Sequence, residues 1–372
     1  MSILSSTKTG RCSIESLMKS CGLNPAFAQL TGDGVVYNGH VNLSKVSIDE
    51  FPVKLIKVTR DLIITHTGLK SLKNMPEEVG GNFVIDHNEL TSLEGGPKVV
   101  HGSFSCVSNR LKNLIGGPEM VESNYVCDNN ELTTLEGALK RSNGCFSCAN
   151  NMLTSLEHCP SYVGWNCYCG YNYIRSLEHA PEYVGGCFSL KHNEIETCDS
   201  KAMLVNYDVD FSYNSIHHIG DCNITISNGG VDFTGNPLSS ISNNICCNGL
   251  IVMHSTGIRE LDTLPEWNRS QYGDNCQYVL SLGYSNHVTR INSIPSSIKY
   301  VLMMTECGRA KAIDMSTHSV DDVNAALNGS IISIYYNKRG DAVIINTHYA
   351  MNVKDYAPTI FAALDNALKD QK

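Results

Sequence analysis

The chain has 372 residues and a formal net charge of −9, and it contains no Lys/Arg-rich patch of the kind that binds duplex nucleic acid. No run of about 18 apolar residues is present, so we expect no membrane-spanning helix. The opening MSILSSTKTGR lacks the apolar core of a secretion signal, so we expect a cytoplasmic protein.

Residues 1–40 come before a repeated pattern, and we expect them to form a helical N-terminal cap. SIESLMKSCGLNPAFAQL has the features of a short helix, with Ser13 as its N-cap and Gly-Leu-Asn-Pro as its stop. The ends of a repeat array need such a cap because the terminal coil would otherwise expose its core.

An asparagine recurs along most of the chain with a spacing of 21 residues, and an eighth follows after 22 residues, at Asn236. The seven evenly spaced positions are Asn88, Asn109, Asn130, Asn151, Asn172, Asn193 and Asn214. A fixed period between about 20 and 50 residues predicts a solenoid. The solenoid is predicted over residues 41–310, and its period becomes irregular after about residue 240.

Apolar residues surround each asparagine at fixed offsets, in the frame LxLxxNxLxxL with aromatic and Cys variants. Residues five and three before the asparagine alternate, which predicts a short strand with both side chains inward. The asparagine amide both donates and accepts, so a ladder of amides can satisfy backbone groups at the turn after each strand. A proline on the return leg, as at Pro97, predicts an extended or polyproline-like return.

This frame resembles that of leucine-rich repeats. The short repeat with proline on its return leg resembles the repeats of bacterial secreted effectors, and the pattern CxNNxLTSLEGxPxxVGG resembles repeat proteins encoded by tailed bacteriophages. The resemblance implies a mainly β leucine-rich-repeat horseshoe with short parallel strands on its concave face. It is specific for the fold but poor for function, because such repeats serve many partners.

Residues 311–372 depart from the repeat and predict an α/β cap or small module. SVDDVNAALNG predicts a helix, and SIISIYYN with DAVIINTHY predicts a hairpin. PTIFAALDNALKD predicts an amphipathic helix.

No phosphate loop, HExxH or GxSxG motif is present, so we expect a protein that is not an enzyme, with no catalytic residues. A weaker alternative is an enzyme within residues 311–372, although His348 and Tyr349 there lack a nucleophile partner.

The 16 cysteines are expected to be reduced, and many to be buried as small apolar side chains. Cys145 and Cys148 have the spacing of half a zinc site, and Cys167 and Cys169 lie one repeat further on. Because Cys145 should point outward, we expect neither a metal nor a cofactor.

The residues expected to face outward on the concave strands are mostly small and uncharged. Aromatic and charged residues stand out at a few positions, where a protein partner would find binding hot spots. These predicted contact residues are Tyr168, Tyr171, Lys191, His192, Asp210 and Tyr213. A second candidate surface lies in an insertion that breaks the period at residues 259–280, and it contains Trp267, Arg269 and Tyr272.

The leading hypothesis is a non-enzymatic module that binds a host or bacterial protein along the concave face. The resemblance to phage repeat proteins implies a phage protein in the host cytoplasm that inhibits or redirects a host or defence protein. The alternative is a virion component or self-assembling scaffold, which would be a homo-oligomer. Neither hypothesis involves direct contact with nucleic acid or with a membrane.

Overall fold

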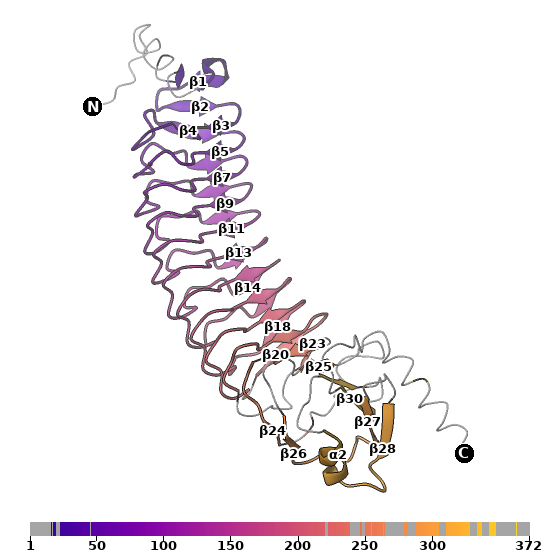
Figure 1. Ribbon diagram of the computed structural model, residues 1–372. Coiled ribbons are helices and arrows are strands. Elements are labelled where there is room, and N and C mark those ends of the chain that lie inside the picture. Colours follow the sequence, from indigo (N-terminus) through magenta and orange to yellow (C-terminus); the bar gives the residue numbers. More distant parts are fainter. Residues whose placement is uncertain are drawn as a thin grey trace. The chain divides into compact units, whose positions relative to one another are not determined.

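Figure 1 shows the computed structural model of the chain. The structure describes residues 16, 18–19, 23–44, 46–219, 222–238, 246–247, 250–253, 255–262, 264, 279–281, 288–304, 310–327, 333–336, 342–346 and 362. The chain divides into two compact units, the first unit (residues 1–188) and the second unit (residues 189–372).

The first unit begins with a short 3-10 helix, η1 (Pro25–Phe27), whose N-cap is Asn24. Strand β1 (Ala28–Leu30) follows and pairs antiparallel with β2 (Val35–Tyr37), which in turn pairs parallel with β4 (Leu55–Val58). The predicted N-terminal helix lies mostly outside the described residues.

Each repeat of the first unit contributes a first strand to one parallel sheet, which we call the first-leg sheet. Its strands are β3 (Val41–Asn42), β5 (Leu62–Ile63), β7 (Phe83–Val84), β9 (Phe104–Ser105), β11 (Tyr125–Val126), β13 (Phe146–Ser147) and β15 (Cys167–Tyr168). Successive strands pair 21 residues apart, so that Tyr125 lies opposite both Phe104 and Phe146. The 21-residue repeat therefore forms a parallel β-solenoid.

The return legs also form β-strands. They are β6 (Glu78–Val79), β8 (Val99–Val100), β10 (Met120–Val121), β12 (Arg141–Ser142), β14 (Tyr162–Val163) and β16 (Tyr183–Val184). β4, β6, β8 and β10 pair in one parallel sheet, and β12, β14 and β16 in another. The return is extended, as predicted, but it pairs in a sheet and is not polyproline-like. Pairing is possible because each proline lies before its strand, so its missing N–H removes no hydrogen bond between strands. The horseshoe form and its concave face stay predictions.

The inward positions form the core as predicted. In the first unit the aromatic residues from Phe83 to Phe146, five before their asparagines, contact one another from coil to coil, and the Phe104 and Tyr125 rings meet edge to face with centroids 4.9 Å apart. The leucines two and five after each asparagine, such as Leu132 and Leu135, are also fully buried. A parallel stack with a 21-residue period places like side chains in contact, so each coil buries its apolar residues against copies of itself.

The buried asparagines form the predicted ladder. The Asn130 side-chain nitrogen donates to the carbonyls of Cys106 (3.0 Å) and Cys127 (3.1 Å), one in the preceding coil and one in its own. Its side-chain oxygen accepts from the Leu111 N–H at 3.1 Å. One amide therefore joins two coils through backbone groups that lie too deep to reach water.

The second unit contains further parallel coil strands, followed toward the C-terminus by strands that also pair antiparallel. β17 (Phe188–Ser189) lies at the boundary of the units, and the other elements are β18 (Met203–Val205), β19 (Val209–Asp210), β20 (Ile224–Ile226), β21 (Val231–Asp232), β22 (Cys246–Cys247), β23 (Leu250–Val252), β24 (Glu260–Leu261), β25 (Val279–Ser281), β26 (Arg290–Ile291), β27 (Tyr300–Met304), β28 (Ala310–Asp314), α2 (Val320–Leu327), β29 (Ser333–Tyr336) and β30 (Ala342–Asn346). Strands β19, β21, β23 and β25 pair in parallel.

The C-terminal hairpin β29–β30 joins the same sheet, because β29 pairs antiparallel with β25. β27 then pairs parallel with β30 and antiparallel with β28. Helix α2 and this hairpin lie where the sequence predicted a helix and a hairpin, whereas the amphipathic helix near the C-terminus falls outside the described residues apart from Ala362. Among the residues that the structure describes, no helix is long and apolar enough to cross a membrane.

Candidate functional site

Two of the predicted contact residues, Tyr168 and Tyr171, are exposed in the first unit. Tyr168 is the second residue of β15 and has 39% of its surface exposed, and its hydroxyl accepts from the Asn166 side-chain nitrogen at 2.8 Å. Tyr171 lies in the turn after that strand, with a left-handed φ of 57°, and is 48% exposed. Both side chains therefore present aromatic surface to solvent.

The same coil exposes two further aromatic residues that the sequence analysis did not single out. Trp165, just before β15, is 66% exposed, and Tyr173 is 50% exposed. Four exposed aromatic side chains thus lie within nine residues, which we call the aromatic segment (residues 165–173). Large exposed aromatic groups are characteristic of contact surfaces, since they bury much area with few rotatable bonds.

One obstacle to a side chain is missing at Trp165. In the preceding coil the equivalent residue is Gly144, and a Cβ there would lie 2.6 Å from the Asn124 side-chain oxygen, which accepts from the Cys145 N–H, and 2.7 Å from the Ser123 backbone. One coil on, Cys145 replaces that asparagine and has no amide oxygen to fill the space. Trp165 can therefore carry a side chain. The same pairing, of an asparagine or aspartate oxygen with a glycine of the next coil, occurs for Asp61 with Gly81 and for Asn82 with Gly102. This pairing was the signal in the sequence that could have identified Trp165.

Several other outward residues, in the first-leg sheet and directly after its strands, are short and form hydrogen bonds within the solenoid. Asp128 accepts from the Ser147 hydroxyl at 2.6 Å and from the Ala149 N–H at 2.8 Å. Asp86 accepts in the same way from Ser105 and from the backbone of Val107. Burial raises the pKa of the Asp128 carboxyl, while these two hydrogen bonds oppose the rise. These carboxylates accept hydrogen bonds from the following coil, so they offer little to a partner.

The remaining predicted contact residues belong to the second unit. His192 and Tyr213 both lie in left-handed turns, and their rings stack at 4.5 Å with an interplanar angle of 8°. Asp210 accepts from the Ser212 N–H and hydroxyl, which holds its carboxylate against the turn. Lys191, which directly precedes His192, is half-buried. The structure thus describes the six predicted residues as two groups, one in each unit.

The three residues predicted for the second candidate surface, Trp267, Arg269 and Tyr272, lie outside the described residues. This surface stays a prediction.

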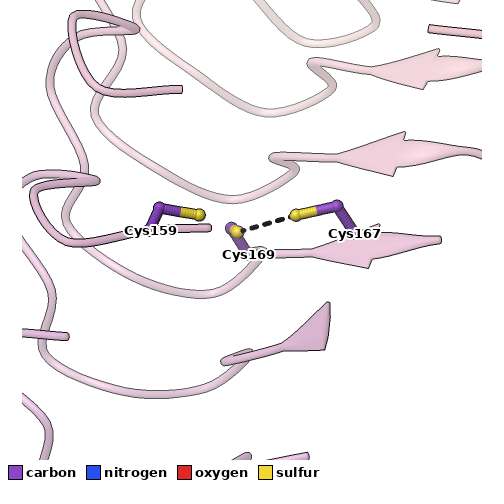
Figure 2. A group of neighbouring side chains, drawn as sticks. All are labelled: Cys159, Cys167 and Cys169. Atoms are coloured by element: carbon purple, nitrogen blue, oxygen red, sulfur yellow. Dashed lines mark hydrogen bonds between the residues drawn. The ribbon is translucent and has the colours of Figure 1, made fainter. Parts of the chain in front are cut away.

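A cluster of four thiols lies inside the first unit. The sulfurs of Cys159, Cys167 and Cys169 all lie within 4.8 Å of one another, and Figure 2 shows them converging from the return leg, from β15 and from the residue after β15. Cys167 and Cys169 are 3.7 Å apart, and the Cys148 thiol donates to Cys169 at 3.5 Å. Cys148, Cys167 and Cys169 are buried, and Cys159 is half-buried.

Cys169 is the centre of this thiol cluster. Hydrogen bonds from Cys148, Cys159 and Cys167 hold the pKa of the Cys169 thiol well below its usual value. The pKa of Cys148 is raised, first because its proton is held by Cys169 and second because it is buried. The hydrogen bonds of the cluster therefore converge on the Cys169 sulfur.

The sequence analysis missed this cluster because it paired Cys148, Cys167 and Cys169 with Cys145. Cys145 is half-buried and stands apart from the group, and Cys159 on the return leg takes its place. The ten cysteines whose side chains are described are all free thiols.

Comparison with models of known protein families, with curated proteins and with solved structures finds no match to the chain.

Proposed function

We propose that the protein is a non-enzymatic module that binds another protein, and that the aromatic segment is its principal contact. The observation that carries this proposal is the exposure of Trp165, Tyr168, Tyr171 and Tyr173 within a single coil. Interface hot spots are enriched in Trp and Tyr, and a solenoid presents such residues on a rigid backbone. The short, engaged side chains on neighbouring strands let a partner approach the coil closely.

The identity of the partner is proposed from the repeat pattern. Its resemblance to leucine-rich-repeat proteins of tailed bacteriophages supports a phage protein acting in the bacterial cytoplasm. In this proposal the protein inhibits or redirects a host or defence protein. The alternative, a virion component or self-assembling scaffold, would use the aromatic segment for contact between copies.

The test uses a variant that gives the aromatic segment the residues of other coils at the same repeat positions. Trp165→Gly, Tyr168→Ser, Tyr171→Asn and Tyr173→Glu take the residues of Gly144, Ser147, Asn150 and Glu131. A matched control, Ile115→Thr with Met120→Lys, removes exposed apolar side chains from another coil of the first unit. Since all of these positions are exposed, both variants should fold like the wild type, as circular dichroism would show.

Tagged wild type, variant and control are used to capture partners from bacterial lysate, and the captured protein is then purified for calorimetry. We expect a stoichiometric partner that the control retains and that binds the variant at least about tenfold more weakly, which corresponds to the loss of one hot-spot side chain. A partner that binds the variant with wild-type affinity would refute the role of the aromatic segment. Self-association by ultracentrifugation, lost in the variant, would favour the scaffold alternative.

A further inference from the structure

The thiol cluster arises where two departures from the repeat meet. Five residues before the asparagine, the flanking coils have Phe146 and Phe188, but this coil has Cys167. Eight residues after the asparagine, the neighbouring coils have Ala138 and Ala180, but the coil before Cys167 has Cys159. Both changes replace the residue typical of the position with cysteine.

These two repeat positions face each other across the core. The equivalent pair two steps earlier in the array is Gly117 and Tyr125, and a Cβ on Gly117 would lie 3.2 Å from the Tyr125 hydroxyl. In that coil the aromatic ring fills the space as far as the return leg. At the thiol cluster the ring is missing, and Cys167 and Cys159 reach into its place from opposite sides, as Figure 2 shows.

The inward position three residues before each asparagine supplies the other two thiols. Cys148 and Cys169 occupy it in successive coils, and their sulfurs lie 3.5 Å apart. A zinc ion bonded to four thiolates at about 2.3 Å requires neighbouring sulfurs about 3.8 Å apart. The separations of Cys169 from Cys148 (3.5 Å) and from Cys167 (3.7 Å) are close to that edge length, and Cys159 lies within 4.8 Å of Cys167 and Cys169. Cys148 contacts Cys169 but does not belong to the mutually close set of Cys159, Cys167 and Cys169, so its sulfur would move toward Cys159 and Cys167 to complete a tetrahedron.

We propose that Cys148, Cys159, Cys167 and Cys169 bind a single thiophilic metal ion, Zn²⁺, inside the first unit. Thiolate sulfur is the ligand type that selects zinc over the hard cations. Four sulfurs with no water leave the coordination shell closed, which is typical of a structural rather than a catalytic site. The half-buried Cys159 provides the route of entry from the return leg.

Binding replaces thiol protons with the metal. Zn²⁺ and four thiols give a tetrathiolate complex of charge −2 and release four protons. The metal–sulfur bonds replace the S–H hydrogen bonds that join these sulfurs without the metal. Metal binding would therefore connect two successive first-leg strands and one return leg through a single centre.

Metal content of the full-length protein is measured first, after purification under reducing, anaerobic conditions with zinc present and then extensive dialysis. We expect one zinc per chain. Zinc is then removed with a chelator and Co²⁺ is titrated in, because tetrahedral cobalt with thiolate ligands gives intense charge-transfer absorption. Zn²⁺ should displace the cobalt and abolish that absorption, and it should protect these four thiols from alkylation, as mapped by mass spectrometry.

The decisive variants restore the residues of neighbouring coils. Cys167→Phe and Cys159→Ala should each abolish stoichiometric binding of zinc and cobalt. The control Cys106→Ala removes a buried thiol at the same ladder position as Cys148, two coils earlier, and should leave one metal per chain. If either decisive variant fails to fold, the alkylation pattern of the wild type with and without zinc decides the question.

Three results would overturn the proposal. One is a wild-type protein that takes up neither zinc nor cobalt while all four thiols stay reduced, which would mean that two thiols merely fill the volume of a phenyl ring. Another is a disulfide between Cys148 and Cys169 in protein prepared under the same reducing conditions. The third is cobalt absorption of unchanged intensity in Cys167→Phe, which would assign the metal to other cysteines.

Discussion

Replacement of Asn130 by alanine should destabilise the first unit more than any exposed asparagine replacement. The Asn130 side chain is buried and bonds to both its own coil and the preceding one. Alanine removes every one of these bonds and introduces no group that could replace them.

The size of the effect follows from which groups lose their last partner. The carbonyls of Cys106 and Cys127 each keep a second donor, the side chains of Asn109 and Asn151. The Leu111 N–H donates to the Asn130 oxygen and would be left buried without it. One orphaned N–H costs about 1–3 kcal/mol, and two further lost hydrogen bonds cost about 1 kcal/mol each, so we expect a loss of about 3–5 kcal/mol.

The free energy of unfolding is measured by urea denaturation followed by circular dichroism, with hydrogen exchange of the Leu111 amide as a local readout. Asn113→Ala is the matched control, because the Asn113 oxygen accepts a single bond from the Ile115 N–H at the surface. It should cost about 1 kcal/mol or less. Equal losses for the two variants, or unchanged protection of the Leu111 amide in Asn130→Ala, would refute the ladder as the source of stability.

Two further predictions concern the same unit. Tyr125→Phe should raise the free energy of unfolding by about 1–3 kcal/mol, measured by urea denaturation, since the buried Tyr125 hydroxyl has no hydrogen-bond partner among the described residues; a loss of stability would show that the hydroxyl is satisfied. Hydrogen bonds to Glu122 and then Glu78 raise the pKa of His101. The stabilisation that protonated His101 adds to the free energy of unfolding is therefore fully present below about pH 6.5 and disappears as pH rises through the raised pKa. The stability difference between wild type and His101→Gln should therefore shrink from pH 6 to pH 9, from a few tenths of a kcal/mol, since the group is near the surface; a pH-independent difference would contradict this assignment.

The sequence was sufficient to predict a mainly β solenoid with short parallel strands, because the repeat gives the same pattern many times. A buried position such as that of Phe104 recurs in coil after coil, so periodicity alone separates inward from outward residues. The asparagine ladder could be predicted for the same reason, since a polar residue fixed at a core position must satisfy backbone groups. The paired return leg could not, because proline next to a strand of two residues leaves no pattern that distinguishes pairing from isolation.

The candidate sites were harder to predict because each depends on where one coil departs from the others. The exposure of Trp165 depends on Cys145 in the coil before it, and the thiol cluster depends on Cys159 reaching the space that Cys167 leaves open. The sequence by itself determined the period, the inward residues and the role of the asparagines, because those features repeat. Only the tertiary structure decided which departures meet, since residues that face each other across the core belong to different legs of neighbouring coils.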